Sequence, residues 1–484
     1  MKKVLLFALV LLLAIPALSF AGSATSRWDL TIGGYVKVDA GYANQAAGAI
    51  EQYYADRNNA FGNQNVSNAA GSFGMATGTS TLNFLVKGPD TWGAKTTAFI
   101  QGNFAAQTSN AGYAGTRYGT FTLTHAYMDF TWANTKLMVG QNWQLWGFMP
   151  SYNFLGMFDF QTAGKGNTVP QITVTQNFGK NFYASLGVQE PYNMKDNLGQ
   201  SAYAGQAQAP VGTSNATATS FNAGQNTTSA RVVSEIPDVV SEIGYKSDAC
   251  GVIGPNMMQF GVGGFWGQDK VIFLTPAASN KGTSTYGTNT VNRWASAFKF
   301  FIPVIPEKNL NKAGALSLSG SIWTGQNLAN FFLGARDIVS TIPYNESSQA
   351  LTSTQRNYGV PVTTGGWGQI SYYFTDKVYF NGLFGYLDNL VSNYYKNQYN
   401  NQVKMNQQYI GNIFYDVNPA VRVALEYSFI RTYYNGYGLG FAGNGSTYLS
   451  QLTTNAASGG TYTGTALGTY GSLQTIRLAF FYFF

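Results

Sequence analysis

The chain ends with the stretch Ile476-Arg477-Leu478-Ala479-Phe480-Phe481-Tyr482-Phe483-Phe484, and no polar residue follows the last aromatic one. Counting back from Phe484 in steps of two gives Tyr482, Phe480, Leu478 and Ile476, so one face of this stretch is wholly apolar. Successive side chains of a β-strand point to opposite faces. The pattern therefore predicts a terminal strand with one face in an apolar environment, which is either lipid or the core of a soluble β-domain.

The other end of the chain has the pattern of an export signal. Lys2 and Lys3 precede an apolar run from Val4 to Ile15, and Ser19-Phe20-Ala21 provides a small-residue cleavage site before Gly22. This order of segments is typical of a secretory signal peptide. The apolar run is shorter than the roughly 20 residues that a membrane-spanning helix needs. We expect residues 1–21 to be cleaved and residues 22–484 to form one mature domain.

The composition favours a membrane barrel over a helical membrane protein. Charged residues make up only 10% of the chain, against about 25% in soluble proteins. Aromatic residues reach 15%, and the mean hydropathy is only −0.10. A charge-poor, aromatic-rich chain without a second long apolar run is typical of a barrel with aromatic girdles.

The net charge of +7 is not arranged in basic runs, so nucleic-acid binding is not expected. Cys250 is the only cysteine, which excludes an intrachain disulfide.

Segments with a period of two recur along the chain. In residues 421–430, Val421, Val423 and Leu425 alternate with Arg422 and Glu426. Such segments are about 9–14 residues long, the length that a tilted strand needs to cross a bilayer. A soluble sandwich would show the same alternation with the apolar set in its core, so the period alone does not decide between the two.

The lengths of the connections favour a transmembrane antiparallel up-and-down β-barrel. We place sixteen strands at residues 28–42, 79–87, 94–104, 118–132, 136–143, 169–178, 181–189, 230–246, 257–268, 293–302, 313–324, 366–374, 378–387, 404–415, 421–431 and 472–484. The connections then alternate between long polar loops and short turns, as extracellular loops and periplasmic turns do. Residues 230–246 and 257–268 alternate poorly and residues 118–132 change phase near His125, so fourteen or eighteen strands are alternatives.

Four stretches in the first 150 residues resemble trimeric Gram-negative outer-membrane porins of the DcaP-like group. They are Gly34-Tyr35-Val36-Lys37-Val38-Asp39-Ala40, Val86-Lys87-Gly88-Pro89, Thr97-Ala98-Phe99-Ile100-Gln101-Gly102-Asn103-Phe104, and Leu123-Thr124-His125-Ala126-Tyr127 followed by Asn134-Thr135-Lys136-Leu137-Met138-Val139-Gly140-Gln141. The resemblance implies a homotrimer of barrels, an inward-folded loop in each pore, and passage of small, often anionic, solutes. Thr122 and Thr124 stand where the group often carries arginines, which argues against strong anion selectivity.

The loop after the fifth strand is the candidate constriction of the pore, because it follows the strand order of general porins. Its aromatic side chains could hold it against the barrel wall. These residues are Trp143, Trp146, Phe148, Tyr152, Phe154, Phe158 and Phe160. The alternative is a surface loop that packs on other loops or on another subunit.

Charged residues on the polar faces of the strands are candidates for lining the pore, because lining charges and pore width decide selectivity. They are Lys37, Asp39, Lys87, Lys95, Glu242, Lys246, Arg293, Lys299, Arg422, Glu426 and Arg477. Bases outnumber acids in this set, which would attract anions mildly. The alternative for Arg422 with Glu426, and for Lys37 with Asp39, is an ion pair within the wall.

The alternatives to a channel are an enzyme and a non-conducting barrel. Catalysis is not expected, because His125 is the only histidine and no nucleophile motif stands near it. No metal cluster or cofactor is expected either. A non-conducting barrel that serves as a surface receptor, an adhesin or the sheath of an electron conduit is the main alternative. The expected partners of the channel are outer-membrane lipid, small polar solutes, two further copies of the chain, and the barrel assembly machinery, which would read Phe484.

Overall fold

The computed structural model describes a large part of the chain. The described residues are 28–45, 55, 70–104, 121–146, 154–155, 168–191, 231–275, 285–326, 328, 362–390, 403–434, 438–439, 466–467 and 469–484. The predicted signal peptide, residues 1–21, lies outside this set. No helix in the described part is long and apolar enough to cross a membrane.

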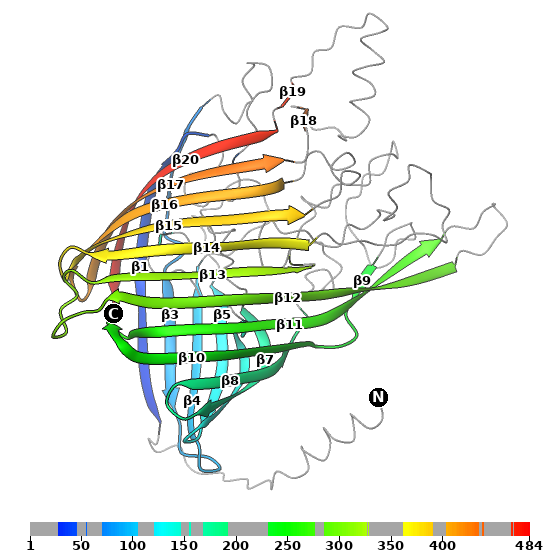
Figure 1. Ribbon diagram of the computed structural model, residues 1–484, viewed down its shortest axis with the longest axis horizontal. Helices are drawn as coiled ribbons and strands as arrows, with labels where there is room; N and C mark the ends of the chain where they lie inside the picture. Colours follow the sequence, from blue (N-terminus) through cyan, green and yellow to red (C-terminus); the bar gives the residue numbers. More distant parts are fainter. Residues whose placement is uncertain are drawn as a thin grey trace, which may run out of the picture.

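Sixteen strands form the wall of a closed antiparallel barrel (Figure 1). They are β1 (Asp29–Ala43), β3 (Thr81–Lys87), β4 (Lys95–Asn103), β5 (Thr122–Thr131), β6 (Thr135–Trp143), β7 (Thr168–Phe178), β8 (Phe182–Gln189), β10 (Asp238–Ile253), β11 (Asn256–Thr275), β12 (Thr285–Ile305), β13 (Leu316–Gln326), β14 (Val362–Tyr373), β15 (Val378–Leu390), β16 (Val403–Asn418), β17 (Val421–Tyr434) and β20 (Tyr470–Phe483). Each pairs with its neighbours in the chain, and β1 pairs with β20 from Tyr35↔Phe483 to Ala43↔Thr475. This last pairing closes the sheet, so the wall has no unpaired edge for lipid to meet.

Four short strands complete the described set. β2 (Ser72–Ala76) pairs with residues 39–43 of β1, whereas β3 pairs with residues 29–35 of β1. β2 therefore extends the line of β3 along the same neighbouring strand, with a break between the two. β9 (Arg231–Val233) pairs with β11 and continues β10 in the same way. β18 (Gly438–Leu439) and β19 (Ala466–Leu467) pair only with each other. The prediction of sixteen wall strands is confirmed, and the alternatives of fourteen and eighteen are wrong.

The two faces of the wall differ in chemistry. On β20, Ile476, Phe480 and Tyr482 are 47%, 49% and 56% exposed. Their neighbours Arg477 and Ala479 point to the other face and are buried. The apolar set of the terminal strand therefore faces outward, where only lipid could cover it. This arrangement rules out the soluble-core interpretation of the alternation.

Two irregularities explain where the sequence pattern was poor. In the β10–β11 pair the register shifts between Ser247 and Val252, and the extra residues of such a bulge exchange inward and outward positions. The connection between the predicted strands 230–246 and 257–268 is therefore shorter than expected, since β10 continues to Ile253 and exposed Cys250 lies within it. In the β4–β5 pair the register shifts beside His125, which confirms the phase change there.

Candidate solute pathway inside the barrel

Most of the charged residues that were proposed to line the pore lie on the inner face of the wall. Each of the following has an exposed fraction below 9%: Lys37, Asp39, Glu242, Arg293, Lys299, Glu426 and Arg477. Lys87 and Lys95 are also on this face by strand parity, but they stand exposed at the rim that carries the short turns. Arg422 lies near the same rim and its side chain is 29% exposed.

One group of inner charges lies on β10, β11 and β12. Arg293 donates to Asp238 over 2.7 Å and to Asp269 over 3.0 Å, and all three side chains are at most 2% exposed. Gln189 on β8 also donates to Asp238. Arg293 is among the residues predicted to line the pore, whereas neither carboxylate is. Asp269 had been placed in a loop because β11 was predicted to end at residue 268, and Asp238 lies in a strand with poor alternation.

A second group lies across β16, β17, β20 and β1. Arg477 pairs with Glu426 over 2.8 Å, because the register of β17 and β20 places these two residues directly opposite each other. Asn412 donates to the other oxygen of Glu426. The predicted wall pair between Arg422 and Glu426 is therefore wrong, since Arg422 pairs with Asp416 on the neighbouring strand.

The other predicted wall pair is present. Lys37 and Asp39, two residues apart on β1, approach to 2.9 Å and are almost completely buried. Neighbouring positions on one face of a strand are within reach of a long side chain. The charged inner wall is thus largely a set of paired groups.

The loop after β6 reaches into the barrel with Trp146 and Phe154. Trp146 is 1% exposed and packs with inner-wall residues of β10–β15, including Phe265 and Trp323. Phe154 packs against a second apolar cluster that contains Trp367 and Leu383. Trp143 contacts His125 on the wall itself. Phe148, Tyr152, Phe158 and Phe160 lie outside the described residues.

Leu155 marks how far the loop travels. Its side chain packs with Tyr379 on β15, Phe414 on β16 and Ala424 on β17. β6 is the fifth strand of the wall, whereas these three strands are the thirteenth to fifteenth of sixteen. They stand on the opposite side of the barrel, so Leu155 lies across the lumen from the end of β6.

The backbone of Leu155 is held by two wall charges of opposite sign. Its N–H donates to Glu426 Oε2 over 2.8 Å, and its carbonyl accepts a hydrogen bond from Lys37 Nζ. Each of these side chains also has a partner of opposite charge, Arg477 for Glu426 and Asp39 for Lys37. Charge-assisted hydrogen bonds in a buried setting are the stronger kind. The sequence offered no signal for this contact, since Leu155 and Glu426 are 271 residues apart.

The inner face offers no recognisable catalytic arrangement in the part of the chain that the structure describes. His125 is 4% exposed and packs with Phe99, Tyr127 and Trp143. Among the same residues, no group of three or more His, Cys, Asp or Glu side chains could hold a metal ion.

Comparisons with known proteins support the fold. No family model and no curated protein sequence matches the chain. Among solved structures, the chain is similar to the outer membrane channel DcaP of Acinetobacter baumannii, with a TM-score of 0.58 and 12% identity over 96% of this chain and 99% of that chain. It is less similar to an anion-selective porin from Comamonas acidovorans, with a TM-score of 0.49 and 12% identity over 94% of this chain and 100% of that chain. Pseudomonas putida OprB follows, with a TM-score of 0.48 and 9% identity over 94% of each chain.

At this identity the likeness to DcaP shows a shared fold. The resemblance to DcaP-like porins that the first 150 residues indicated is confirmed at that level. The porin-type fold and the outward apolar belt together place the chain in a bacterial outer membrane.

Proposed function

We propose that the chain forms a water-filled outer-membrane channel for passive diffusion of small polar solutes, with a mild preference for anions. The observation that carries the proposal is a closed barrel whose outer face is apolar, whose inner face is polar, and whose lumen holds Trp146 and Leu155 of the loop after β6. In such a barrel this loop is the constriction, and the inner side chains are the pore lining. No catalytic step is part of the proposal.

The mild anion preference has a different source from the one that the sequence suggested. Among the described buried residues, acids outnumber bases by six to four, and most of them pair with each other. These paired groups add little field of one sign. Exposed lysines gather instead at the rim with the short turns, among them Lys95, Lys180 and Lys377. Their field would favour anions there, and salt would screen it over about 10 Å at 0.1 M ionic strength.

The channel is tested by conductance of the purified, refolded protein in a planar bilayer. We expect stepwise conductance and, under a salt gradient, a reversal potential of the sign that an anion-preferring pore gives. Raising the ionic strength should reduce the preference because rim charges are screened. A well-folded barrel without conductance would overturn the proposal.

A homotrimer is part of the proposal, and the outer face of β4 and β5 supports it. Outward positions there alternate in size, since Ala98 stands opposite Met128 and Ala126 opposite Ile100, and Met128 and Ile100 are 48% and 45% exposed. Side chains of a second barrel could fill the gaps over the two alanines. Mass measurement of the detergent-solubilised protein should give three chains, and A126W should shift it toward single chains. The substitution I322W on the other side should not.

Export and assembly complete the proposal. Residues 1–21 would be removed during export, and the barrel assembly machinery would recognise the terminal Phe484, whose side chain is 56% exposed. Deletion of Phe484 should reduce the amount of folded barrel in the outer membrane, while F374A, at an exposed aromatic residue elsewhere, should not. Equal amounts of barrel after both changes would exclude this role.

One observation favours the alternative of a non-conducting barrel. Inner polar side chains such as Gln408, Glu426 and Arg293 are 0–1% exposed, although a wide water-filled lumen would wet them. A barrel of this kind would act as a surface receptor, an adhesin or a sheath for an electron conduit. It would give no stepwise conductance, and removal of the loop after β6 would be needed to open it.

A further inference from the structure

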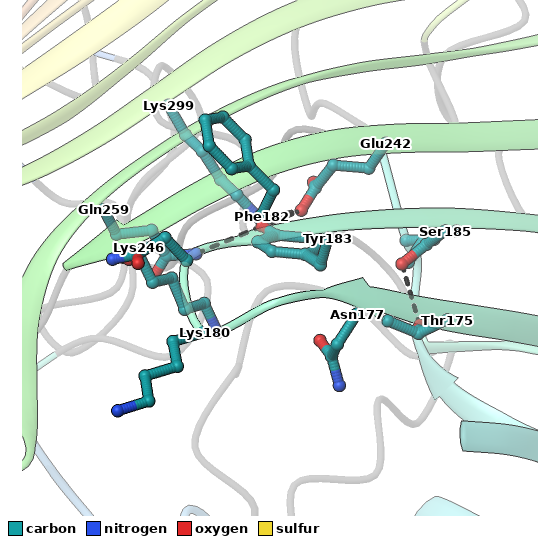
Figure 2. Close-up of a pocket in the computed structure, with 12 residues that line it drawn as sticks. Thr175, Asn177, Lys180, Phe182, Tyr183, Ser185, Glu242, Lys246, Gln259 and Lys299 are labelled. Atoms are coloured by element: carbon teal, nitrogen blue, oxygen red, sulfur yellow. Dashed lines mark hydrogen bonds and ion pairs between the residues drawn. The ribbon is translucent and has the colours of Figure 1, made fainter. Parts of the chain in front are cut away.

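A cavity of about 300 Å³ lies on the inner side of the wall, at the end of the barrel with the short turns. Figure 2 shows its side chains coming from β7 and the turn after it, from β8, and from β10 to β12. Leu145, in the loop that leaves β6, also lines it. The cavity therefore lies beside the start of that loop, on the periplasmic side by the position of the turns.

Two glycines make room for the floor of this cavity. A Cβ atom at Gly244 would stand 2.2 Å from the ring of Tyr183, and one at Gly261 would stand 2.7 Å from Cε of Lys299. Both side chains can lie flat on the wall only because these positions lack a side chain. Tyr183 donates to Glu242 over 2.6 Å, and Lys299 pairs with Glu242 over 2.7 Å. The floor is therefore fixed, and its one carboxylate is already engaged.

The turn after β7 is fastened to β10 at the edge of the cavity. Asn181 accepts from the backbone N–H of Lys246 and donates through its side chain to the carbonyl of Lys246, both over 2.7 Å. This contact places Lys180 and Lys246 at the same opening, and Figure 2 shows Lys180 at its outer edge. Both lysines are exposed, and Lys246 Nζ lies 5.1 Å from the centre of the Tyr183 ring. Three lysines and one glutamate give the lining a formal charge of +2.

We propose that this cavity binds a small oxyanion that also carries hydroxyl groups, for which a sugar acid is the simplest form. Lys246 and Lys180 would hold the anionic group, because an ammonium forms charge-assisted hydrogen bonds with oxyanions. Thr175 and Ser185, which bond to each other over 2.8 Å, and Gln259, which donates to Tyr183 over 3.4 Å, line the same cavity. Their remaining lone pairs and N–H group can bond to hydroxyls. The volume lies at the lower end of ligand pockets, which range over about 300–1,000 Å³, and suits a six-carbon solute. The inference rests on the proposed channel, because the solute would reach the cavity through the lumen.

The test is binding of gluconate to the full, folded barrel in detergent micelles, followed by saturation-transfer NMR. This readout does not depend on conductance, so a failure of the site and a failure of the channel remain distinguishable. We expect a saturable gluconate signal that glucose, its neutral counterpart, fails to displace. The double substitution K180Q/K246Q should raise the apparent dissociation constant for gluconate about tenfold, because the charge-assisted contacts are lost.

A matched double variant separates the site from the general charge of the rim. K308Q/K377Q removes two exposed lysines from other short turns at the same end of the barrel and should leave gluconate binding unchanged. Equal weakening by both double variants, or no saturable binding to the native barrel, would overturn the site. Acetate that displaces gluconate at equal concentration would overturn the role of the hydroxyl groups. G244A, which pushes Tyr183 off the wall, should weaken binding without removing a charge.

Discussion

The described residues of the loop after β6 attach to the inner wall at two places, and the two attachments use different chemistry. At β10–β13 it inserts Trp146 into an apolar cluster that lies near the buried Arg293 and its two carboxylates. On the opposite side, the backbone of Leu155 bonds to Glu426 on β17 and to Lys37 on β1. The side chain of Leu155 also packs with apolar residues of β15 to β17. The first attachment depends on the shape of one side chain. The second depends on wall charges that hold the backbone of Leu155.

This difference predicts how each attachment can be broken. Loss of an apolar anchor leaves a cavity, whereas loss of one member of a buried charge pair leaves its partner without compensation. The wall charges near the first attachment stabilise the barrel, and those at the second also hold the loop. The substitutions below separate these roles.

The largest effect is expected for R293M, which leaves Asp238 and Asp269 buried next to each other without their cation. Breaking a buried pair in this way costs about 3–5 kcal/mol. The free energy of unfolding, from urea titration in micelles followed by tryptophan fluorescence, should fall by that amount. The triple variant D238N/R293M/D269N should recover most of the loss, because no unpaired charge remains. A triple variant as unstable as R293M would contradict the electrostatic explanation.

The next effect is expected for W146A, which empties the apolar cluster under the first attachment. Removal of a buried Trp side chain costs about 3–5 kcal/mol, part of which comes from the docked state of the loop. Single-channel recordings should therefore show larger and noisier conductance steps than those of the native channel. W143A, at a half-buried residue that contacts His125 rather than the cluster, should change the recordings less. Unchanged recordings for W146A would show that the loop does not limit the pore.

A smaller effect is expected for E426Q at the second attachment. The amide can still accept the Leu155 N–H, but it no longer compensates Arg477, which is 3% exposed. The loss should be about 3 kcal/mol, the lower end of the cost of breaking a buried pair, and the channel should fluctuate between two conductance levels as the loop detaches and returns. E235Q makes the same change at a side chain that is 65% exposed, and its recordings should match those of the native channel.

The smallest effect is expected for K87Q at the rim. Lys87 and Asp29 approach to 3.2 Å, but both side chains are more than half exposed. An exposed pair of this kind contributes about 0.5 kcal/mol or less. K37M, which breaks the buried pair with Asp39 and the bond to Leu155, should lower the free energy of unfolding by several times as much. Similar losses for both variants would remove the distinction between the rim and the lumen.

The wall could be predicted from the sequence nearly strand by strand. The terminal strand was placed at 472–484 and β20 spans Tyr470–Phe483, because lipid on one face enforces a strict apolar alternation. The pattern failed where the membrane no longer imposes it. β11 and β12 continue well past their predicted ends, and the bulge in β10 exchanges inward and outward positions.

The interior of the barrel was less predictable, for a physical reason. Inner charges were recognised as polar positions, but their partners depend on the register between strands. Arg477 meets Glu426 through the pairing of β17 with β20, and Arg293 meets Asp269 through that of β11 with β12. The aromatic side chains of the loop after β6 gave a signal at Trp146. The backbone contacts of Leu155 gave none, because every residue has the same N–H and carbonyl groups.

The strands differ greatly in length around the wall, which gives the barrel an uneven height. β11 and β12 contain 20 and 21 residues, whereas β3 to β6 contain 7 to 10, and Figure 1 shows β11 and β12 reaching far beyond their neighbours. A 21-residue strand is about 70 Å long, although about 9–11 residues suffice to cross the bilayer. The described wall is therefore much taller on this side than along β3 to β6, and both strands continue well past the length that the bilayer requires. The part of the β11–β12 pair beyond the bilayer is ordered sheet outside the membrane, which gives a large particle such as an antibody a rigid surface to bind.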